Sequence, residues 1–217
     1  MQSYNFSNNS NLVAAERTAT SLLISYFSSV HCFISMPTFR VTPDRVVVQL
    51  FYYAPTNFVG TGKNGDTTKL TSGGPALNAL GSALSRLFST TTSLVNVPVE
   101  LRITRLHQPY LNSYILAQYL AVNASKYGFA RLRQSLLSSV CNNIQNAAAM
   151  PSDHGEPSAI LGVKVQLSGL LTTQRNAPRK TVSTVSVGTF HGKNLNTSVE
   201  YASSTSKSNL GAYTVKV

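Results

Sequence analysis

The chain has 217 residues, of which 42% are hydrophobic, so it can bury one large core or two small ones, and wholesale disorder is excluded. Only 12% of the residues are charged, yet eighteen Lys and Arg face seven Asp and Glu, and the formal net charge is +11. Such a balance favours a polyanionic partner, with nucleic acid ahead of an anionic membrane.

The cysteines and histidines show no spacing typical of metal binding or catalysis. Cys32 and Cys141 lie far apart and outside any CxxC pattern, so we expect two reduced thiols rather than a zinc site. The histidines are scattered, and His154 lies beside Asp153 in a segment with the prolines and glycine of a loop. We therefore expect no enzyme, no metal and no cofactor.

No stretch predicts insertion into a membrane. Residues 21–36 are apolar in patches, but the segment is short, rich in serine and interrupted by His31. The N-terminal residues resemble neither a secretory signal nor an arginine-rich transit peptide. A peripheral membrane protein therefore stands only as a third interpretation, behind two that involve RNA.

The first half of the chain begins with a helix and two strands. Residues 1–17 are expected to form a flexible terminus, and helical spacing of apolar residues predicts a helix over 14–30. Pro37 interrupts the strand predicted over 32–41, which is typical of an edge strand. Residues 45–53, mostly β-branched and aromatic, predict a more central strand.

A glycine-rich loop, a helix and a third strand follow. The loop covers residues 54–74. Pro75 stands at a favoured first-turn position and starts a helix with an apolar stripe. Residues 97–105 then alternate as a strand does.

The second half predicts two helices followed by a sheet. The break at 107–109 is the expected domain boundary. The first helix is apolar on most sides and should be buried, whereas the second is amphipathic. The predicted elements are helices over 110–122 and 126–148 and strands over 159–171, 181–187 and 213–217.

The strand over 159–171 carries the clearest pattern. Val163, Val165 and Leu167 alternate with polar residues, which predicts one buried and one solvated face. No acidic residue lies between Glu156 and Glu200, although this span is basic. We expect a cationic hairpin that forms a single plate with the neighbouring helix.

These elements predict an α+β fold with two domains. Residues 18–107 would form the first, and residues 108–217 would form a C-terminal domain of two helices packed on a small, mostly antiparallel sheet. The order in the first domain matches a type II KH domain in which one helix is missing or collapsed into the glycine-rich loop. KH domains hold nucleic-acid phosphates at a G-x-x-G turn, and Gly62-Lys-Asn-Gly65 has these letters in a degenerate glycine loop.

Several motifs resemble the family of the third protein of the small ribosomal subunit. The family carries a strand G-[IV]-K-V-x-[VL]-S-G-R-L, an [IV]-[DE]-Y strand and a terminal G-x-x-[GT]-V-K-V. The corresponding segments here are LGVKVQLSGL at 161–170, VEY at 199–201 and LGAYTVKV at 210–217. Leu170 replaces the arginine expected after Ser-Gly. The composition, rich in Ser, Asn, Thr and Tyr, is similar to that of mitochondrial, fungal members.

The resemblance implies a structural constituent of the mitochondrial small ribosomal subunit, located in the matrix. It would bind ribosomal RNA in the head, line the region where messenger RNA enters, and adjoin the second, tenth and fourteenth small-subunit proteins. Arg131 and Arg133 stand where the family has basic residues on a helix, and Arg131 would face the messenger. The candidate RNA-binding residues are Lys63, Arg131, Arg133, Lys164, Arg175, Arg179, Lys180, Lys193 and Lys207.

The main alternative is a free-standing regulator of the KH type that binds single-stranded RNA. It would depend on the glycine loop, so Asp at Gly62 and Gly65 would abolish its RNA binding. A ribosomal constituent would assemble with little change.

Overall fold

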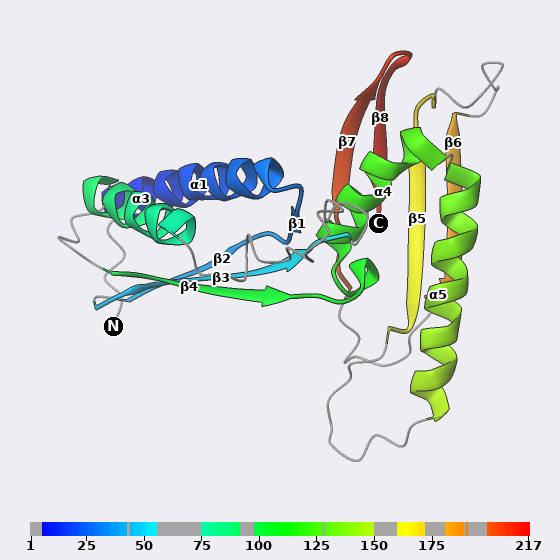
Figure 1. Cartoon of the computed structure of the whole chain (residues 1–217), viewed down its shortest axis with the longest axis horizontal. Helices are drawn as coiled ribbons and strands as arrows, with labels where there is room; N and C mark the ends of the chain where they lie inside the picture. The colour runs from blue at the N-terminus through cyan, green and yellow to red at the C-terminus, as the bar shows by residue number, and fades with distance from the viewer. Residues whose placement is uncertain are drawn as a thin grey trace. The chain divides into compact units, whose positions relative to one another are not determined.

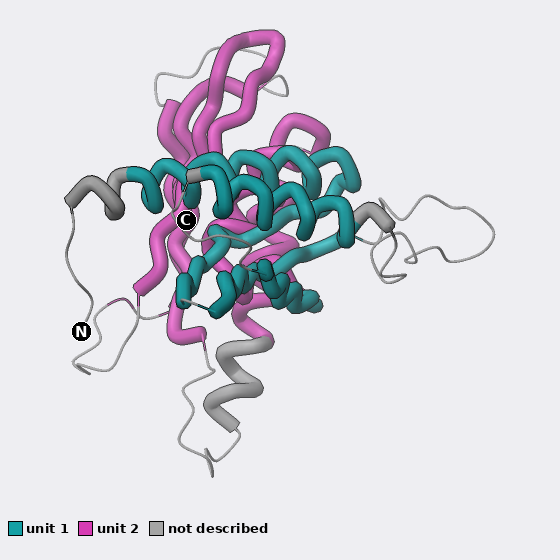
Figure 2. The backbone as a smooth tube through the Cα atoms, turned by 90° about the vertical axis from the view of Figure 1, so that its left-hand side faces the viewer, with its two compact units in different colours: residues 1–107 teal, residues 108–217 magenta. Residues whose placement is uncertain are grey.

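The computed structural model divides into two compact units, residues 1–107 and 108–217, which are coloured separately in Figure 2. Each unit combines helices with a sheet of its own, and this confirms the α+β class. The structure describes residues 6–42, 44–55, 75–91, 98–127, 129–149, 160–171, 181–188, 190 and 199–217.

The N-terminal unit is a sheet with two helices on one face (Figure 1). Its elements are α1 (Phe6–Ser29), β1 (Phe33–Ile34), β2 (Thr38–Val41), β3 (Val46–Tyr53), α3 (Pro75–Thr91) and β4 (Val99–Arg105). β1 and β2 both pair antiparallel with β3, and β4 pairs parallel on its other side. Pro37 separates β1 from β2 on the same edge of β3, as its missing N–H predicts.

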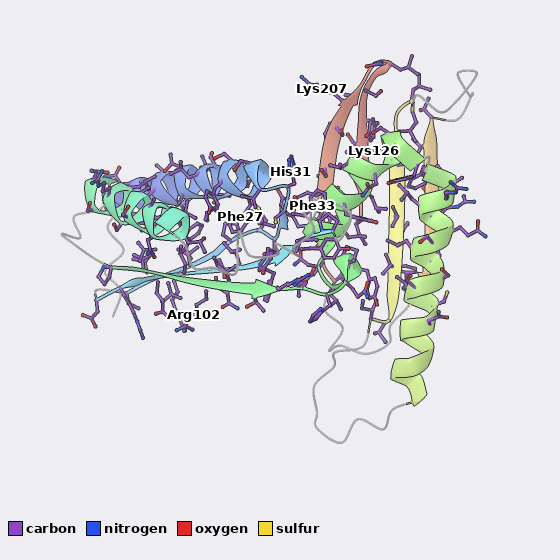
Figure 3. All side chains as sticks on the ribbon, viewed as in Figure 1. Phe27, His31, Phe33, Arg102, Lys126 and Lys207 are labelled. Carbon is purple, nitrogen blue, oxygen red and sulfur yellow. The ribbon has the colours of Figure 1, made fainter. Side chains whose placement is uncertain are left out.

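The core of this unit forms between the helices and the alternate residues of β3. Val46, Val48 and Leu50 are fully buried, and they pack with Phe27 of α1 and Phe88 of α3. Figure 3 shows Phe27 between α1 and the sheet. Burying an aromatic or aliphatic side chain of this size stabilises a fold by about 1.5–3 kcal/mol, so this cluster holds the helices on the sheet.

Helix α1 starts earlier than the sequence pattern predicts. It begins at Phe6, so residues 6–13, which lie in the expected flexible terminus and before the predicted helix over 14–30, are helical. Ala19 and Ala15 are completely buried, about one and two turns before Leu23 respectively. Small side chains at this spacing let the helix backbone approach the core, which extends the packed face towards the N-terminus.

We predict that Gly81→Ala stabilises the N-terminal unit. Gly81 lies inside α3, and an added Cβ would meet nothing within 4 Å. Alanine removes the entropic penalty of a helical glycine, a gain of about 0.5–1 kcal/mol. Hydrogen exchange of α3 amides should slow by about two- to fivefold. Ala79→Gly, an exposed change in the same helix, is the control and should accelerate it; no slowing in Gly81→Ala would contradict the prediction.

The C-terminal unit has two helices on one face of a four-stranded sheet (Figure 1). The strand order is β6-β5-β8-β7, and all three pairings are antiparallel. Its elements are a short 3-10 turn η2 (Pro109–Leu111), α4 (Ser113–Tyr127), α5 (Phe129–Ala149), β5 (Gly162–Ser168), β6 (Val182–Gly188), β7 (Ser203–Ser208) and β8 (Gly211–Lys216).

Alternation along β5 decides which sheet face the helices cover. Val163, Val165 and Leu167 are buried, as predicted, and they pack with Leu120 of α4 and Val140 of α5. The polar residues between them therefore face away from the helices. The two-helix layer and the antiparallel sheet thus agree with the architecture predicted for this half.

Helix α4 begins three residues after the predicted position. Pro109 and its neighbours form a 3-10 turn, and Asn112 then has an extended backbone. The side-chain Oδ1 of Asn112 accepts hydrogen bonds from the N–H groups of Tyr114 at 3.1 Å and Ile115 at 3.2 Å. Asn112 is therefore the N-cap that sets the start of the helix.

The first strand of the final hairpin, β7, begins later than expected. The family resemblance predicted a strand at 199–201, but the pairing with β8 begins at Ser203, and 199–201 is irregular. β7 contains Ser, Thr and Lys only, so neither hydrophobic alternation nor β-branched content indicates a strand. It forms because β8 offers a free edge and a tight turn joins the two strands.

Candidate nucleic-acid interface

The structure describes four of the nine predicted RNA-binding residues. Arg131 and Arg133 lie on α5, Lys164 on β5 and Lys207 on β7, and all four are exposed. The remaining five lie outside the described residues: Lys63, Arg175, Arg179, Lys180 and Lys193.

The sheet face of the C-terminal unit that points away from the helices carries three of the six Lys and Arg residues that the structure describes in this unit. We call it the outer sheet face. Lys164 lies there because it alternates with the buried Val163 and Val165. Lys207 also lies there, on the edge strand β7 opposite Ala212 of β8. Figure 3 shows it near the tip of the β7–β8 hairpin.

Lys216 is a further cation on the outer sheet face that our sequence prediction missed. It is exposed on β8, opposite Gln166 of β5 and Ser203 of β7. Its alternation with Val215, which is completely buried, could have identified it. Because Lys164 lies two residues from Gln166, Lys216 and Lys164 are diagonal neighbours, which places the two ammonium groups at one end of the sheet.

Hydroxyl and amide groups fill the space between these lysines. Thr205 and Thr214 face each other across β7 and β8 with their Oγ atoms 3.1 Å apart. The only apolar residues in these rows are Val182 and Ala212. The polar members, besides the lysines, are Gln166, Ser168, Thr184, Ser186, Ser203, Thr205 and Thr214.

No carboxylate lies among the described residues of the outer sheet face. The described acid of this unit is Glu200, whose Oε2 accepts a hydrogen bond at 3.2 Å from the N–H of Ser113, at the start of α4. A negative charge there is favourable because it meets the positive end of the helix dipole. Glu200 thus stabilises a helix terminus, and no described acidic residue lies beside the lysines on their own face.

The two arginines of α5 lie on the other layer of the unit. Phe129, Leu136 and Val140 turn one side of α5 towards the sheet, which leaves Arg131 and Arg133 exposed on the helical side. The described lysines and arginines of this unit therefore do not form the expected single plate, and the hairpin cations of that prediction lie outside the described residues: Arg175, Arg179, Lys180 and Lys193. Lysines on the sheet and arginines on the helix face opposite directions, because the helix packs on the face that the lysines avoid.

Arg133 also has a packing role. Its side chain helps to line a small apolar space of about 10 Å³ with residues of α4, α5, β5 and β6. The aliphatic stem of an arginine can cover apolar surface while its guanidinium reaches water. Arg133 therefore presents its charge close to the α5–β6 border, whereas Arg131 lies further out on the helix.

In the N-terminal unit, by contrast, a carboxylate neutralises part of the charge. Glu100 accepts a hydrogen bond from Arg102 at 2.8 Å and one from Arg45 at 3.1 Å. The Arg102 hydrogen bond lowers the pKa of Glu100, Coulombic attraction to Arg102 and Arg45 adds to it, and desolvation opposes it. Figure 3 shows Arg102 projecting from the sheet on the side opposite the helices. These arginines are less available to phosphate than the lysines of the outer sheet face.

Other kinds of site find no support in the part of the chain that the structure describes. It contains no group of three or more His, Cys, Asp or Glu placed to hold a metal ion. None of its helices combines the length and apolarity needed to cross a membrane. Burial raises the pKa of the Cys32 thiol, and Arg105 only partly opposes this, so Cys32 is a poor nucleophile.

Comparison with known proteins gives two matches. A family model described as mitochondrial ribosomal protein (VAR1) matches residues 32–217. A protein of Mycosarcoma maydis named small ribosomal subunit protein uS3m is 36% identical over 198 residues. That alignment covers 85% of this chain and 66% of the relative, so the chain spans just under two thirds of the relative's length.

Proposed function

Because the chain belongs to the VAR1 family of mitochondrial ribosomal proteins, we propose that it is a structural constituent of the mitochondrial small ribosomal subunit that binds ribosomal RNA in the head. A role in the mitochondrial ribosome is structural rather than enzymatic. The proposed RNA contact is supported by the composition of the outer sheet face. This face has three lysines and many hydroxyl groups, and no described carboxylate lies among them.

This surface suits an RNA backbone. Lys164, Lys207 and Lys216 can each neutralise phosphates and release condensed counterions. Serine, threonine and glutamine side chains donate hydrogen bonds to phosphate and sugar oxygens, which positions RNA without reading its sequence. Four predicted contacts outside the described residues belong to the same unit and would add to its positive charge: Arg175, Arg179, Lys180 and Lys193. Lys63 belongs to the N-terminal unit and would be a separate contact.

The arginines of α5 support a second contact. Arg131 and Arg133 are exposed on the layer opposite the lysines, so one unit can touch RNA on two sides. We place Arg131 at the channel where messenger RNA enters, with ribosomal RNA on the outer sheet face. The second, tenth and fourteenth small-subunit proteins would be its neighbours in the head.

Removing the lysines should weaken RNA binding and its salt dependence together. We predict that the triple variant Lys164→Gln, Lys207→Gln and Lys216→Gln lowers the slope of log affinity against log salt by about 2–3, at about 0.7–0.9 per phosphate contact. Filter binding of the full chain to a transcript of the small-subunit head RNA measures it. Arg17→Gln with Arg86→Gln, exposed on α1 and α3, is the control; an equal change of slope per charge in both variants would refute a dedicated surface.

Sucrose-gradient sedimentation tests the assembly itself. In mitochondrial extract, the protein should sediment with the small subunit, and the triple lysine variant should shift towards the free fraction. Sedimentation of the unaltered protein only as a free species would reject the proposal.

The alternative is an RNA-binding regulator of the KH type. The strand pattern of the N-terminal unit supports a KH-like domain, since an antiparallel and a parallel pairing meet at β3 beneath two helices. The glycine turn at 62–65, with Lys63, lies outside the described residues. Gly62→Asp with Gly65→Asp separates the two functions: it would abolish RNA binding by a regulator and leave sedimentation of a ribosomal constituent almost unchanged.

A further inference from the structure

An exposed aromatic side chain lies just before β7 in the C-terminal unit. Tyr201 is 69% exposed, which makes it the most exposed aromatic residue that the structure describes. Burying the apolar part of such a ring against a partner is favourable. The phosphate contacts proposed for the outer sheet face give this ring no role.

The neighbours of Tyr201 show on which face of the sheet its ring lies. Ala202 extends the pairing of β7 with β8, since its N–H donates to the carbonyl of Val217 at 3.0 Å and its carbonyl accepts from the N–H of Val217 at 2.9 Å. Ala202 is buried, and Oε2 of Glu200 accepts a hydrogen bond at 3.2 Å from the N–H of Ser113 at the start of α4. Both even-numbered neighbours therefore lie on the helix side. Alternation along the chain places Tyr201 between them on the outer sheet face.

Two lysines lie beside this ring. Lys216 of β8 has Ser203 opposite it on β7 and Gln166 opposite it on β5. Tyr201 and Lys164 each precede these opposite residues by two positions, and β5 and β7 run in the same direction because both are antiparallel to β8. Tyr201 and Lys164 are therefore the two diagonal neighbours of Lys216 at one end of the sheet, each about 7–8 Å from it, within reach of long side chains.

This arrangement matches the parts of a nucleotide. An ammonium group attracts a phosphate, and an aromatic ring stacks on the face of a base. A ring with lysines beside it can hold a base while the lysines neutralise the adjacent phosphates. The carboxylate of Glu200, next to the ring in the chain, is directed to α4 on the other side of the sheet.

We infer that Tyr201 stacks on an unpaired base of the ribosomal RNA, whose adjacent phosphates bind Lys216 and Lys164. The inference rests on the proposed function and names the kind of RNA that this end of the outer sheet face binds. The bases of a duplex stay stacked inside the helix, so a nucleotide in a loop, a bulge or an end has to supply the free face. Because every base has such a face, the ring selects an unpaired nucleotide rather than a particular base.

Substitutions at Tyr201 separate stacking from charge. In filter binding of the full chain to the transcript of the head RNA, Tyr201→Ala should lower the affinity about fivefold to a hundredfold, the effect of losing one base–aromatic stack. The slope of log affinity against log salt should change by less than about 0.7, the share of one phosphate contact, because no cation is removed. Tyr201→Phe keeps the ring and should bind almost as the unaltered chain does.

Tyr127→Ala is the matched control, because it removes an exposed tyrosine from α4 in the same unit. It should leave the affinity unchanged. Hydrogen exchange of the β7 and β8 amides should be the same in all three variants, since neither ring is buried. An equal loss of affinity in Tyr127→Ala or in Tyr201→Phe, or faster exchange in Tyr201→Ala, overturns the inference.

Ultraviolet cross-linking identifies the nucleotide. Irradiation of the complex between the full chain and the transcript, followed by mass spectrometry, should give an adduct of Tyr201 with a nucleotide in a loop, a bulge or an end. Lys164→Gln with Lys216→Gln should reduce its yield several-fold at saturating protein, because the phosphates no longer hold the base over the ring. Lys207→Gln, near the other end of β7, is the control and should not. No adduct at Tyr201, an adduct with a paired nucleotide, or an equal effect of Lys207→Gln overturns the inference.

The same measurements distinguish this inference from the proposed function. Failure of the unaltered chain to bind the head RNA rejects the proposed function. Binding of the unaltered chain with no loss in Tyr201→Ala rejects the stacking site alone and leaves the lysine surface. Small subunits isolated from mitochondria should give the same adduct on irradiation. Its absence there would show that another component, such as a neighbouring protein, covers the ring, and this also overturns the inference.

Discussion

Gly169→Ala is expected to destabilise the C-terminal unit by about 2–6 kcal/mol. Gly169 has φ +119°, a region that costs an L-residue about 1–3 kcal/mol. An alanine Cβ would also lie 2.8 Å from Cβ of Tyr213 and 2.9 Å from the carbonyl oxygen of Ala212. These atoms belong to a central strand and cannot swing aside, so the sheet itself must shift, at a further cost of about 1–3 kcal/mol.

Gly211→Ala provides the matched control for the close approach. Gly211 has a similar φ of +127°, but an added Cβ would meet nothing within 4 Å. It should therefore lose only the conformational part, about 1–3 kcal/mol. Urea unfolding of the full chain by circular dichroism, with hydrogen exchange of β5 and β8 amides, compares the two. Equal losses would show that the contact between Gly169 and β8 does not limit the fold.

The strands with alternating apolar residues could be predicted from sequence. In β5, Val163, Val165 and Leu167 repeat at the period of a strand, and one side of a sheet has to bury them. The same reasoning gave the strand partner β6 and the terminal strand β8. In these strands the local alternation of apolar residues and the burial of one sheet face indicate the same structure.

Elements stabilised by their neighbours could not be predicted. β7 has no apolar residue, and the edge of β8 makes it a strand. The first turns of α1, residues 6–13, are polar and rich in asparagine, so their composition does not predict the helix that they form. Pairing to a free strand edge leaves no periodic pattern in the sequence.

The positions of the candidate RNA-binding residues could likewise be predicted only in part from the sequence. Lys164 could be placed on a solvated face by alternation alone, and Lys216 could have been, by the same rule. That the arginines of α5 lie on the opposite layer depends on which sheet face the helix covers. Tertiary packing decides which face the helix covers. The basic residues in the sequence could therefore suggest an RNA-binding protein, but they could not show on which side of the unit each one lies.

Tyr213→Ala is expected to cost the C-terminal unit about 3–5 kcal/mol, the range for removal of a large buried aromatic side chain. Tyr213 is 1% exposed and packs in the core between the sheet and α4. Its hydroxyl donates a hydrogen bond at 2.6 Å to the carbonyl oxygen of Ala121. The residue thus fills the centre of the core and also ties β8 to α4.

Tyr213→Phe separates these two contributions. It retains the ring and removes only the hydrogen bond, so we expect a loss of about 0.5–1.5 kcal/mol. Urea unfolding of both variants measures the difference, and the position of β8 gives a second readout. Because β8 lies between β5 and β7 and carries Lys216, loosening it in Tyr213→Ala should weaken RNA binding, whereas Tyr213→Phe should bind as the unaltered chain does. If the phenylalanine variant lost as much stability as the alanine variant, the hydroxyl rather than the ring would anchor the sheet to α4.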